Sequence, residues 1–273
     1  MTKRLALDHM TAVDTTPVQL VEVAAQTGCA AMCLFMQPMD VLPLMPKFAI
    51  YGDAAQCAEL KAAMQANGVA LDVAYPFTLA GRTQVADFAT AMECAAELGA
   101  AQPGGAGVLN ALVYDRDPVR RVDTFGQFCD MARGFGLKVG VEFYPPSQVP
   151  SLAAALELVA AIGRPGEVGV NADLLHLMRS GGTIAELAAA PVGTVLYGQL
   201  ADAPAAMPDS IDEEASSARQ LLGAGDFDVA GFVAALPEGC PISIEIPRNA
   251  AVPSESTFER AEKAVKSARA ILG

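Results

Sequence analysis

The sequence lacks the features that would place the chain at a membrane or on nucleic acid. No apolar run approaches the roughly 20 residues that a membrane-spanning helix needs. The first residues, MTKRLALDHMTAVD, hold only a very short apolar run before Asp8, which argues against a secretory signal. Positive charge is scarce, since 18 Lys and Arg stand against 31 Asp and Glu, and the net charge of −13 repels phosphate backbones. We therefore expect a cytoplasmic protein whose partners include neither a membrane nor a nucleic acid.

Histidine is scarce too, and no two cysteines have the CxxC spacing. The chain has two His, His9 and His176, and the latter lies in the stretch NADLLHLMRSGG three residues after Asp173. Most of the six cysteines sit in apolar surroundings, so we expect buried, reduced thiols. These cysteines are Cys29, Cys33, Cys57, Cys94, Cys129 and Cys240.

The sequence does contain a regular alternation of short apolar runs and amphipathic stretches. With 52% hydrophobic and 18% charged residues, the composition is that of a globular protein. Several of the apolar runs are nearly continuous, as in strands that are buried on both faces of a parallel sheet. We expect strands at 4–9, 30–35, 69–75, 107–115, 137–144, 167–173, 194–202 and 241–247. We expect helices at 16–28, 53–68, 83–100, 117–136, 151–163, 183–190 and 258–273.

Eight such strand–helix units predict a single α/β domain over residues 1–273, a (β/α)8 TIM barrel. The competing fold is a doubly wound open sheet, which usually has a Gly-rich phosphate loop after its first strand. The segment after the first expected strand, DHMTAVDTTP, is not such a loop. One insertion, at about 202–228, is longer than an ordinary strand-to-helix loop. We expect it to hold a helix near 211–222 and to form either a lid over the strand ends or a surface excursion.

Four consecutive expected strands end in oxygen-bearing side chains. Active sites of barrels lie at the carboxyl ends of the strands, so these side chains are expected to meet. Three carboxylates and one amide would repel one another, and a divalent cation would remove that cost. Oxygen ligands suit Mg²⁺ or Mn²⁺ best, with Co²⁺ as an alternative. The four residues are Glu142, Asp173, Gln199 and Glu245.

At these residues the chain resembles the sugar phosphate isomerase/epimerase family, the xylose isomerase-like TIM barrels. The resemblance covers essentially the whole chain and is strongest in VEFYPPSQV, VGVNADLLHLMRSGGT, LYGQLADAP, ARQLLGAGDFD and ISIEIP. It implies that Glu142, Asp173, Gln199 and Glu245 bind one divalent metal ion. It also implies that Glu142 and Glu245 act as an acid/base pair and that His176 contacts the substrate. Manganese and magnesium are the expected ions, with Co²⁺ and Zn²⁺ as alternatives.

The reaction implied is sugar or sugar phosphate isomerisation or epimerisation. Loss of a proton next to a carbonyl would give a metal-stabilised enediolate of a small polyhydroxy carbonyl substrate. Gln199 stands where the epimerases usually carry His, which favours a second hypothesis, a dehydratase of the 3-dehydroshikimate or inosose type. A third hypothesis is a barrel that binds ligands without catalysis. The family also suggests that copies of the chain associate as a homo-oligomer.

Further residues are candidates for contact with the substrate. Arg179, Arg219 and Arg248 follow the sixth, seventh and eighth strands and are suited to an anionic group. We favour Arg219, because the segment ARQLLGAGDFD matches the family. His9 ends the first expected strand, where it would either face the cavity or form a hydrogen bond at the barrel rim.

Overall fold

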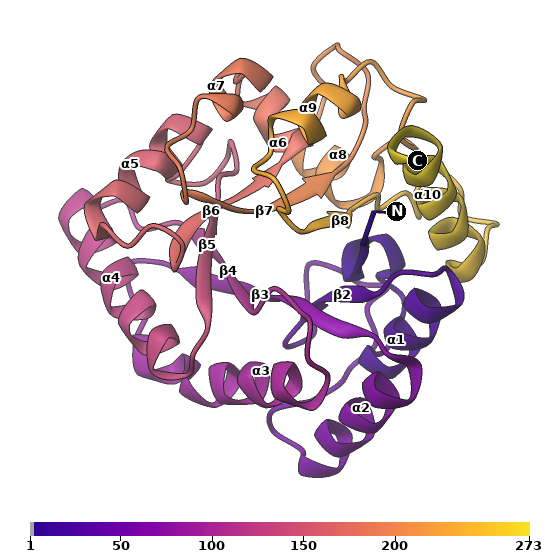
Figure 1. Ribbon diagram of the computed structural model, residues 1–273, viewed down its shortest axis with the longest axis horizontal. Helices are drawn as coiled ribbons and strands as arrows, with labels where there is room; N and C mark the ends of the chain where they lie inside the picture. Colours follow the sequence, from indigo (N-terminus) through magenta and orange to yellow (C-terminus); the bar gives the residue numbers. More distant parts are fainter. Residues whose placement is uncertain (1–2) are drawn as a thin grey trace.

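The eight predicted strands form a closed barrel. The computed structural model describes residues 3–273, and each strand pairs in parallel with the next in chain order, β8 closing onto β1 (Figure 1). This confirms the (β/α)8 prediction. The strands are β1 (Ala6–Asp8), β2 (Ala31–Phe35), β3 (Ala70–Leu79), β4 (Val108–Val113), β5 (Lys138–Glu142), β6 (Val168–Asp173), β7 (Val195–Leu200) and β8 (Ile242–Ile244).

The helices surround the barrel and carry the expected end signals. Thr16 caps α1 together with Gln19 in a reciprocal capping box, and Pro17 takes the first helical position. The helices are α1 (Pro17–Gln26), α2 (Ala54–Asn67), α3 (Ala89–Ala101), α4 (Pro118–Gly134), α5 (Leu152–Ile162), α6 (Leu174–Arg179), α7 (Ile184–Ala188), α8 (Ile211–Ser217), α9 (Val229–Ala235) and α10 (Thr257–Leu272). Two 3₁₀ turns, η1 (His9–Ala12) and η2 (Val85–Phe88), precede α1 and α3.

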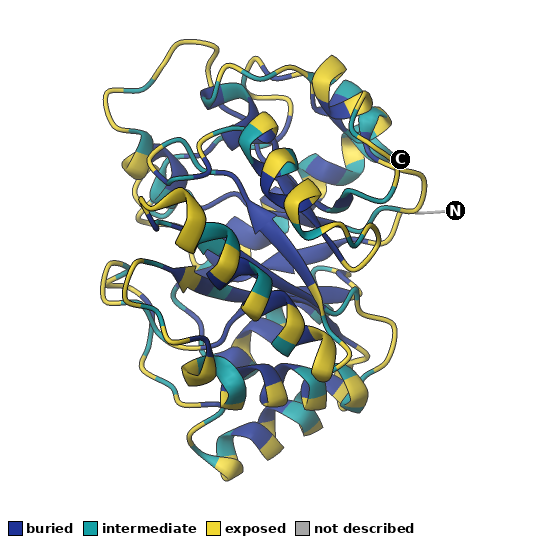
Figure 2. Cartoon of the chain, turned by 90° about the vertical axis from the view of Figure 1, so that its left-hand side faces the viewer, coloured by how far each residue is buried: buried dark blue, intermediate teal, exposed yellow. Residues whose placement is uncertain are grey.

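The main hydrophobic core lies between the strands and the helices. Figure 2 shows the strands as buried and the helices as buried on the inner side and exposed on the outer side. Every residue of β2 is buried, which explains its continuous apolar sequence AMCLF. None of the helices in residues 3–273 combines the length and the apolar character that crossing a membrane requires.

The insertion after β7 differs from the prediction in the end of its helix. We expected a helix near 211–222, but α8 ends at Ser217. The backbone then leaves the helix, because the N–H of Arg219 donates to the carbonyl of Pro247 and that of Gln220 donates to Asp202. These two bonds draw residues 218–220 across the strand ends and carry the side chain of Arg219 into the barrel mouth.

Asp202 fixes the returning part of the same insertion. Its buried carboxylate accepts hydrogen bonds from the backbone N–H groups of Gly223, Gly225 and Phe227. A Cβ atom on Gly225 would lie 2.2 Å from the Asp202 carboxylate, so only glycine allows this approach. The segment LADAP therefore anchors a loop, which in turn holds α8 and Arg219 over the strand ends.

Candidate active site

The carboxyl ends of the later strands bring the predicted acidic residues together. Glu142 ends β5, Asp173 ends β6, and Glu245 directly follows β8. Side chains alternate along a strand, so the residues two positions earlier also point inward, and Asn171 of β6 accordingly reaches Gln199 of β7. All three carboxyl groups are buried.

Arg219 is the cation of this cluster. Its Nη1 donates to Asp173 Oδ2 at 2.7 Å, and its Nη2 donates to Glu245 Oε1 at 2.9 Å. Its Nε donates to the carbonyl of Ala215 at 3.0 Å, so all three nitrogens of the guanidinium have partners. The side chain is 1% exposed. Burial alone would raise the pKa of Asp173, but the guanidinium and His176 hold it below the usual value.

Asp8 is a fourth carboxyl group in the cluster and is not among the site residues predicted from the sequence. It ends β1 beside β8 and accepts hydrogen bonds from the Tyr75 hydroxyl and the Met10 N–H. Burial raises its pKa to about 6. Burial also raises the pKa of Glu245 well above its ordinary value, and Asp8 adds to that rise. One guanidinium thus faces four buried carboxyl groups, an arrangement that favours a further cation.

The residues present fit a divalent cation. Glu142, Asp173 and His176 each offer one ligand atom, and these atoms lie within 4.8 Å of one another. Nδ1 of His176 lies 3.1 Å from Glu142 Oε1, but neither ring nitrogen makes a hydrogen bond although both are buried. Two carboxylates and an imidazole with free nitrogens form a donor set for Mn²⁺, Zn²⁺ or Co²⁺.

Gln199 does not present its carbonyl oxygen to this cluster as predicted. Its Oε1 accepts a hydrogen bond from Asn171 Nδ2 at 2.6 Å, and its Nε2 donates to Glu245. An amide N–H cannot ligate a cation, so metal ligation by Gln199 would require the amide to turn over. In this structure it is His176, rather than Gln199, that presents a free donor atom beside Glu142 and Asp173.

Two other residues predicted to bind substrate, His9 and Arg179, form hydrogen bonds or a salt bridge with other parts of the protein. His9 is buried, with Nε2 3.0 Å from the Thr15 carbonyl and Nδ1 accepting from the Phe35 N–H. Burial lowers its pKa to about 4, so the ring is neutral at pH 7. Arg179 makes a bidentate, buried salt bridge with Glu214, with both N–O distances at 2.7 Å. His9 therefore has hydrogen bonds at the barrel rim, Arg179 is paired with α8, and neither residue lines the cavity that opens onto the cluster.

A cavity of about 560 Å³ opens onto the cluster. Glu142, His176, Arg219 and Glu245 line it, and Asp212 and Ser216 of α8 form part of its rim. Asp212 accepts a hydrogen bond from the Tyr144 hydroxyl, which joins α8 to the segment after β5. The ring centroids of Tyr144 and His176 also lie 4.8 Å apart. The insertion therefore forms one side of the cavity.

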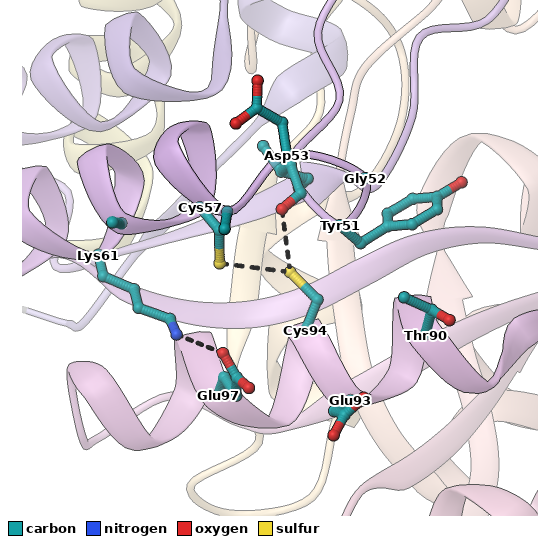
Figure 3. Close-up of a pocket in the computed structure, with 12 residues that line it drawn as sticks. Tyr51, Gly52, Asp53, Cys57, Lys61, Thr90, Glu93, Cys94 and Glu97 are labelled. Atoms are coloured by element: carbon teal, nitrogen blue, oxygen red, sulfur yellow. Dashed lines mark hydrogen bonds and ion pairs between the residues drawn. The ribbon is translucent and has the colours of Figure 1, made fainter.

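A second hollow, of about 430 Å³, lies between α2 and α3 (Figure 3). Cys57 and Cys94 point toward each other there, with their sulfurs 3.9 Å apart, and Lys61 pairs with Glu97 at the edge. Burial and the neighbouring Cys57 raise the pKa of Cys94 to about 12, so this thiol stays protonated at neutral pH. The acidic side chains that line this hollow, Asp53, Glu93 and Glu97, are not buried. Among the described residues, only Glu142, Asp173 and His176 converge closely enough to hold a metal ion.

The fold has counterparts among solved structures. The IOLI protein with a binding zinc atom has 20% identity and a TM-score of 0.78, with 99% of this chain and 98% of that one covered. A D-allulose 3-epimerase from Methylomonas sp. has 16% identity and a TM-score of 0.67, with 99% of each chain covered. The probable 3-DHS dehydratase AsbF from Bacillus anthracis has 11% identity and a TM-score of 0.72, with 97% of this chain and 98% of that one covered.

No curated protein has a significant match to this chain in sequence. The family model described as xylose isomerase-like TIM barrel matches residues 21–271, nearly the whole chain and all of the cluster except Asp8. The chain therefore belongs to the xylose isomerase-like TIM barrel family.

Proposed function

We propose that this protein is a divalent-metal-dependent enzyme that moves a proton next to the carbonyl group of a hydroxycarbonyl substrate, giving an isomer or epimer. The observation that carries the proposal is the buried cluster of Glu142, Asp173, His176 and Glu245, open to one cavity. Burying four carboxyl groups beside one guanidinium lowers the free energy of unfolding, and such destabilising charge clusters are typical of active sites. A barrel that only binds ligands has no need of such a cluster.

Glu142, Asp173 and His176 would hold the ion. When bound, it would supply Lewis-acid stabilisation of the negative charge that develops on the substrate oxygen. The family resemblance implies a different set for this chain, in which Gln199 and Glu245 would join Glu142 and Asp173 as ligands. The two sets share Glu142 and Asp173 but differ in His176, Gln199 and Glu245, so the metal affinity of variants at these positions separates them. His176→Gln should weaken Mn²⁺ binding at least about tenfold if His176 is a ligand, and Gln199→Met should then change it little.

Glu142 and Glu245 would move the proton, and two observations support this assignment. Both line the cavity, one from β5 and one after β8, with β6 and β7 between them. Asn110 donates to Glu142, and Arg219 and Gln199 donate to Glu245, so each carboxylate is fixed in orientation. Carboxylates on two sides of a bound substrate can take a proton from one face and return it on the other.

A dehydratase is the second candidate. The same proton abstraction followed by departure of a β-hydroxyl group would give loss of water. Gln199, in place of the His usual in the epimerases, favours this outcome, and one of the structural neighbours carries the name of a dehydratase. A cytoplasmic location, a small polyhydroxy carbonyl substrate and association of copies remain predictions.

Solvent proton exchange tests both candidates. The protein with Mn²⁺ is incubated in D2O with a panel of ketoses and inososes, and the recovered compounds are analysed by mass spectrometry and NMR. Deuterium next to the carbonyl supports the proposal, with unchanged composition for an epimerase and loss of water for a dehydratase. The control is Glu142→Gln, which should exchange nothing. Equal exchange by that variant would contradict the role of Glu142.

A further inference from the structure

The cavity over the cluster has two unlike halves. Every charged side chain that lines it comes from β5 to β8 and the insertion: Glu142, His176, Asp212, Arg219 and Glu245. The half formed by β1 to β4 and the loop after β2 contributes no charged group to the lining within residues 3–273. Its lining is mostly apolar, with Met10, Phe35, Met39, Leu42 and Leu112. Its polar groups are the uncharged hydroxyls of Tyr75, Thr78 and Tyr114.

Apart from the proposed metal ion, the charged half has, among the residues that the structure describes, no unpaired cationic side chain for a phosphate group. In the described part of the chain, Arg219 is the only Lys or Arg that lines the cavity, and its nitrogens already donate to Asp173, Glu245 and Ala215. Arg179, the nearest alternative on this side, is bound to Glu214. A phosphate would instead meet the carboxylates of Glu142, Asp212 and Glu245, so its approach is unfavourable.

The apolar half of the cavity lining, called the wall below, is formed by side chains that pack against one another. The rings of Phe35 and Tyr75 lie 4.3 Å apart, and His9 packs edge-on against Phe35 with ring centroids 5.6 Å apart. Phe35, Tyr75 and Met10 are each less than 10% exposed and belong to one buried cluster, against which Met39 and Leu42 pack. His9, neutral and bonded at both nitrogens, is the support of this wall. A preformed apolar surface of this kind binds an apolar ligand group without a cost of reorganisation.

We propose that the substrate has two unlike ends: a hydroxycarbonyl end that reaches the carboxylate cluster, and an uncharged apolar end, such as a ring, that lies on the wall of Phe35, Met39 and Leu42. A phosphorylated end would find neither an apolar partner nor an unpaired Lys or Arg among the described lining residues, so we expect phosphorylated sugars to bind less well than this substrate. The hydroxycarbonyl end rests on the proposed function, whereas the apolar subsite rests on the cavity alone. A volume of about 560 Å³ is within the roughly 300–1,000 Å³ of sites for drug-sized ligands, and gives room for both ends.

Three small probes that share the group CO–CH2OH test this proposal. They are 2-hydroxyacetophenone, dihydroxyacetone and dihydroxyacetone phosphate, which carry a phenyl, a hydroxymethyl and a phosphate-bearing end. Affinities are measured by isothermal titration calorimetry with Mn²⁺ present throughout. Burial of the phenyl ring should give 2-hydroxyacetophenone at least about tenfold tighter binding than dihydroxyacetone. Dihydroxyacetone phosphate should bind more weakly than dihydroxyacetone.

Two variants of the same loop distinguish binding at the apolar wall from non-specific hydrophobic binding. Leu42→Asp places a charge on the half-buried lining and should abolish the preference for the phenyl probe. Leu44→Asp is the matched control, because Leu44 is 52% exposed and lies outside the lining. It should leave the preference unchanged.

The outcomes distinguish the apolar subsite from the proposed function. Equal affinities for the three probes, tightest binding of the phosphate, or no binding of 2-hydroxyacetophenone would overturn the inference. A phenyl preference lost only in Leu42→Asp would support it, even if the exchange experiment in D2O found no proton abstraction. Conversely, exchange with simple ketoses and no phenyl preference would retain the proposed function and remove the apolar subsite.

Discussion

Replacement of Arg219 by Met tests how the cluster is held together. The change keeps much of the side-chain volume but removes the guanidinium, which bonds Asp173 at 2.7 Å and Glu245 at 2.9 Å. Both carboxyl groups would remain buried without their cation. Breaking a buried ion pair in this way costs about 3–5 kcal/mol, partly offset by proton uptake at about 1.4 kcal/mol for each unit of pKa shift. We expect Arg219→Met to lose about 3 kcal/mol of unfolding free energy.

The assay is urea unfolding at pH 7.5 with a chelator, so that no metal ion replaces the lost charge. Adding Glu245→Gln to Arg219→Met removes one of the stranded carboxylates and should recover at least about 1 kcal/mol relative to additivity. Arg133→Met is the control, because that side chain is 60% exposed and its ion pair with Asp130 is worth less than about 1 kcal/mol. A loss no larger than that of the control, or strict additivity in the double variant, would refute the reasoning.

Three further predictions follow from the cluster and from His9. Glu142→Gln and Glu245→Gln should each abolish turnover while the far-UV circular dichroism and the unfolding transition are retained; surviving activity of a tenth or more would contradict the acid/base roles. His176→Ala should raise KM or weaken metal binding more than it changes the fold, and unchanged steady-state kinetics would make His176 structural. The pKa of His9 in the native state is lowered to about 4, so between pH 6.5 and 4 the unfolded chain binds a proton at His9 and the native state does not. The free energy of unfolding should therefore fall by up to about 3 kcal/mol as the pH drops through this window. His9→Asn should lack that part of the pH dependence in urea unfolding, and parallel stability profiles would show that His9 does not titrate in this way.

The positions of the strands and of three carboxylates follow from sequence patterns that are local. Alternating apolar and amphipathic segments place the eight strands, and an acid at a strand end of a barrel points to the mouth, which identifies Glu142, Asp173 and Glu245. The same rule applies to Asp8 at the end of β1. The expected first strand, 4–9, ends one residue later than β1, so it singles out the neighbouring His9 instead.

Other features depend on contacts between distant segments and are not visible in any local pattern. The direction of the Gln199 amide is set by Asn171, and the partner of Arg179 is Glu214, 35 residues away. The early end of α8 depends on acceptors at Pro247 and Asp202. Arg219 was favoured as an anion-binding residue, but the structure shows its guanidinium paired with the carboxylates of the protein itself.

The apolar side of the cavity likewise depends on contacts between distant segments. Each apolar residue of the cavity wall resembles an ordinary core residue in the sequence, because Phe35 ends a buried strand and Met39 lies in a loop rich in Met and Pro. Only the fold places both on one side of the cavity that opens onto the cluster. The contrast between the two halves of the cavity is therefore a property of the structure alone.

The most direct test of the central claim is the effect of divalent ions on unfolding of the metal-stripped protein. Mn²⁺, Mg²⁺, Co²⁺ and Zn²⁺ are titrated while the unfolding midpoint and the bound ion are measured, for the native chain and for Asp173→Asn. A ligand that binds only the native state adds about 2.7 kcal/mol at a hundred times its Kd, so the account predicts one ion per chain, a raised midpoint, and loss of both in the variant. If none of the four ions binds or shifts the midpoint of the native chain, Glu142, Asp173 and His176 do not form a metal site and the proposed chemistry is wrong.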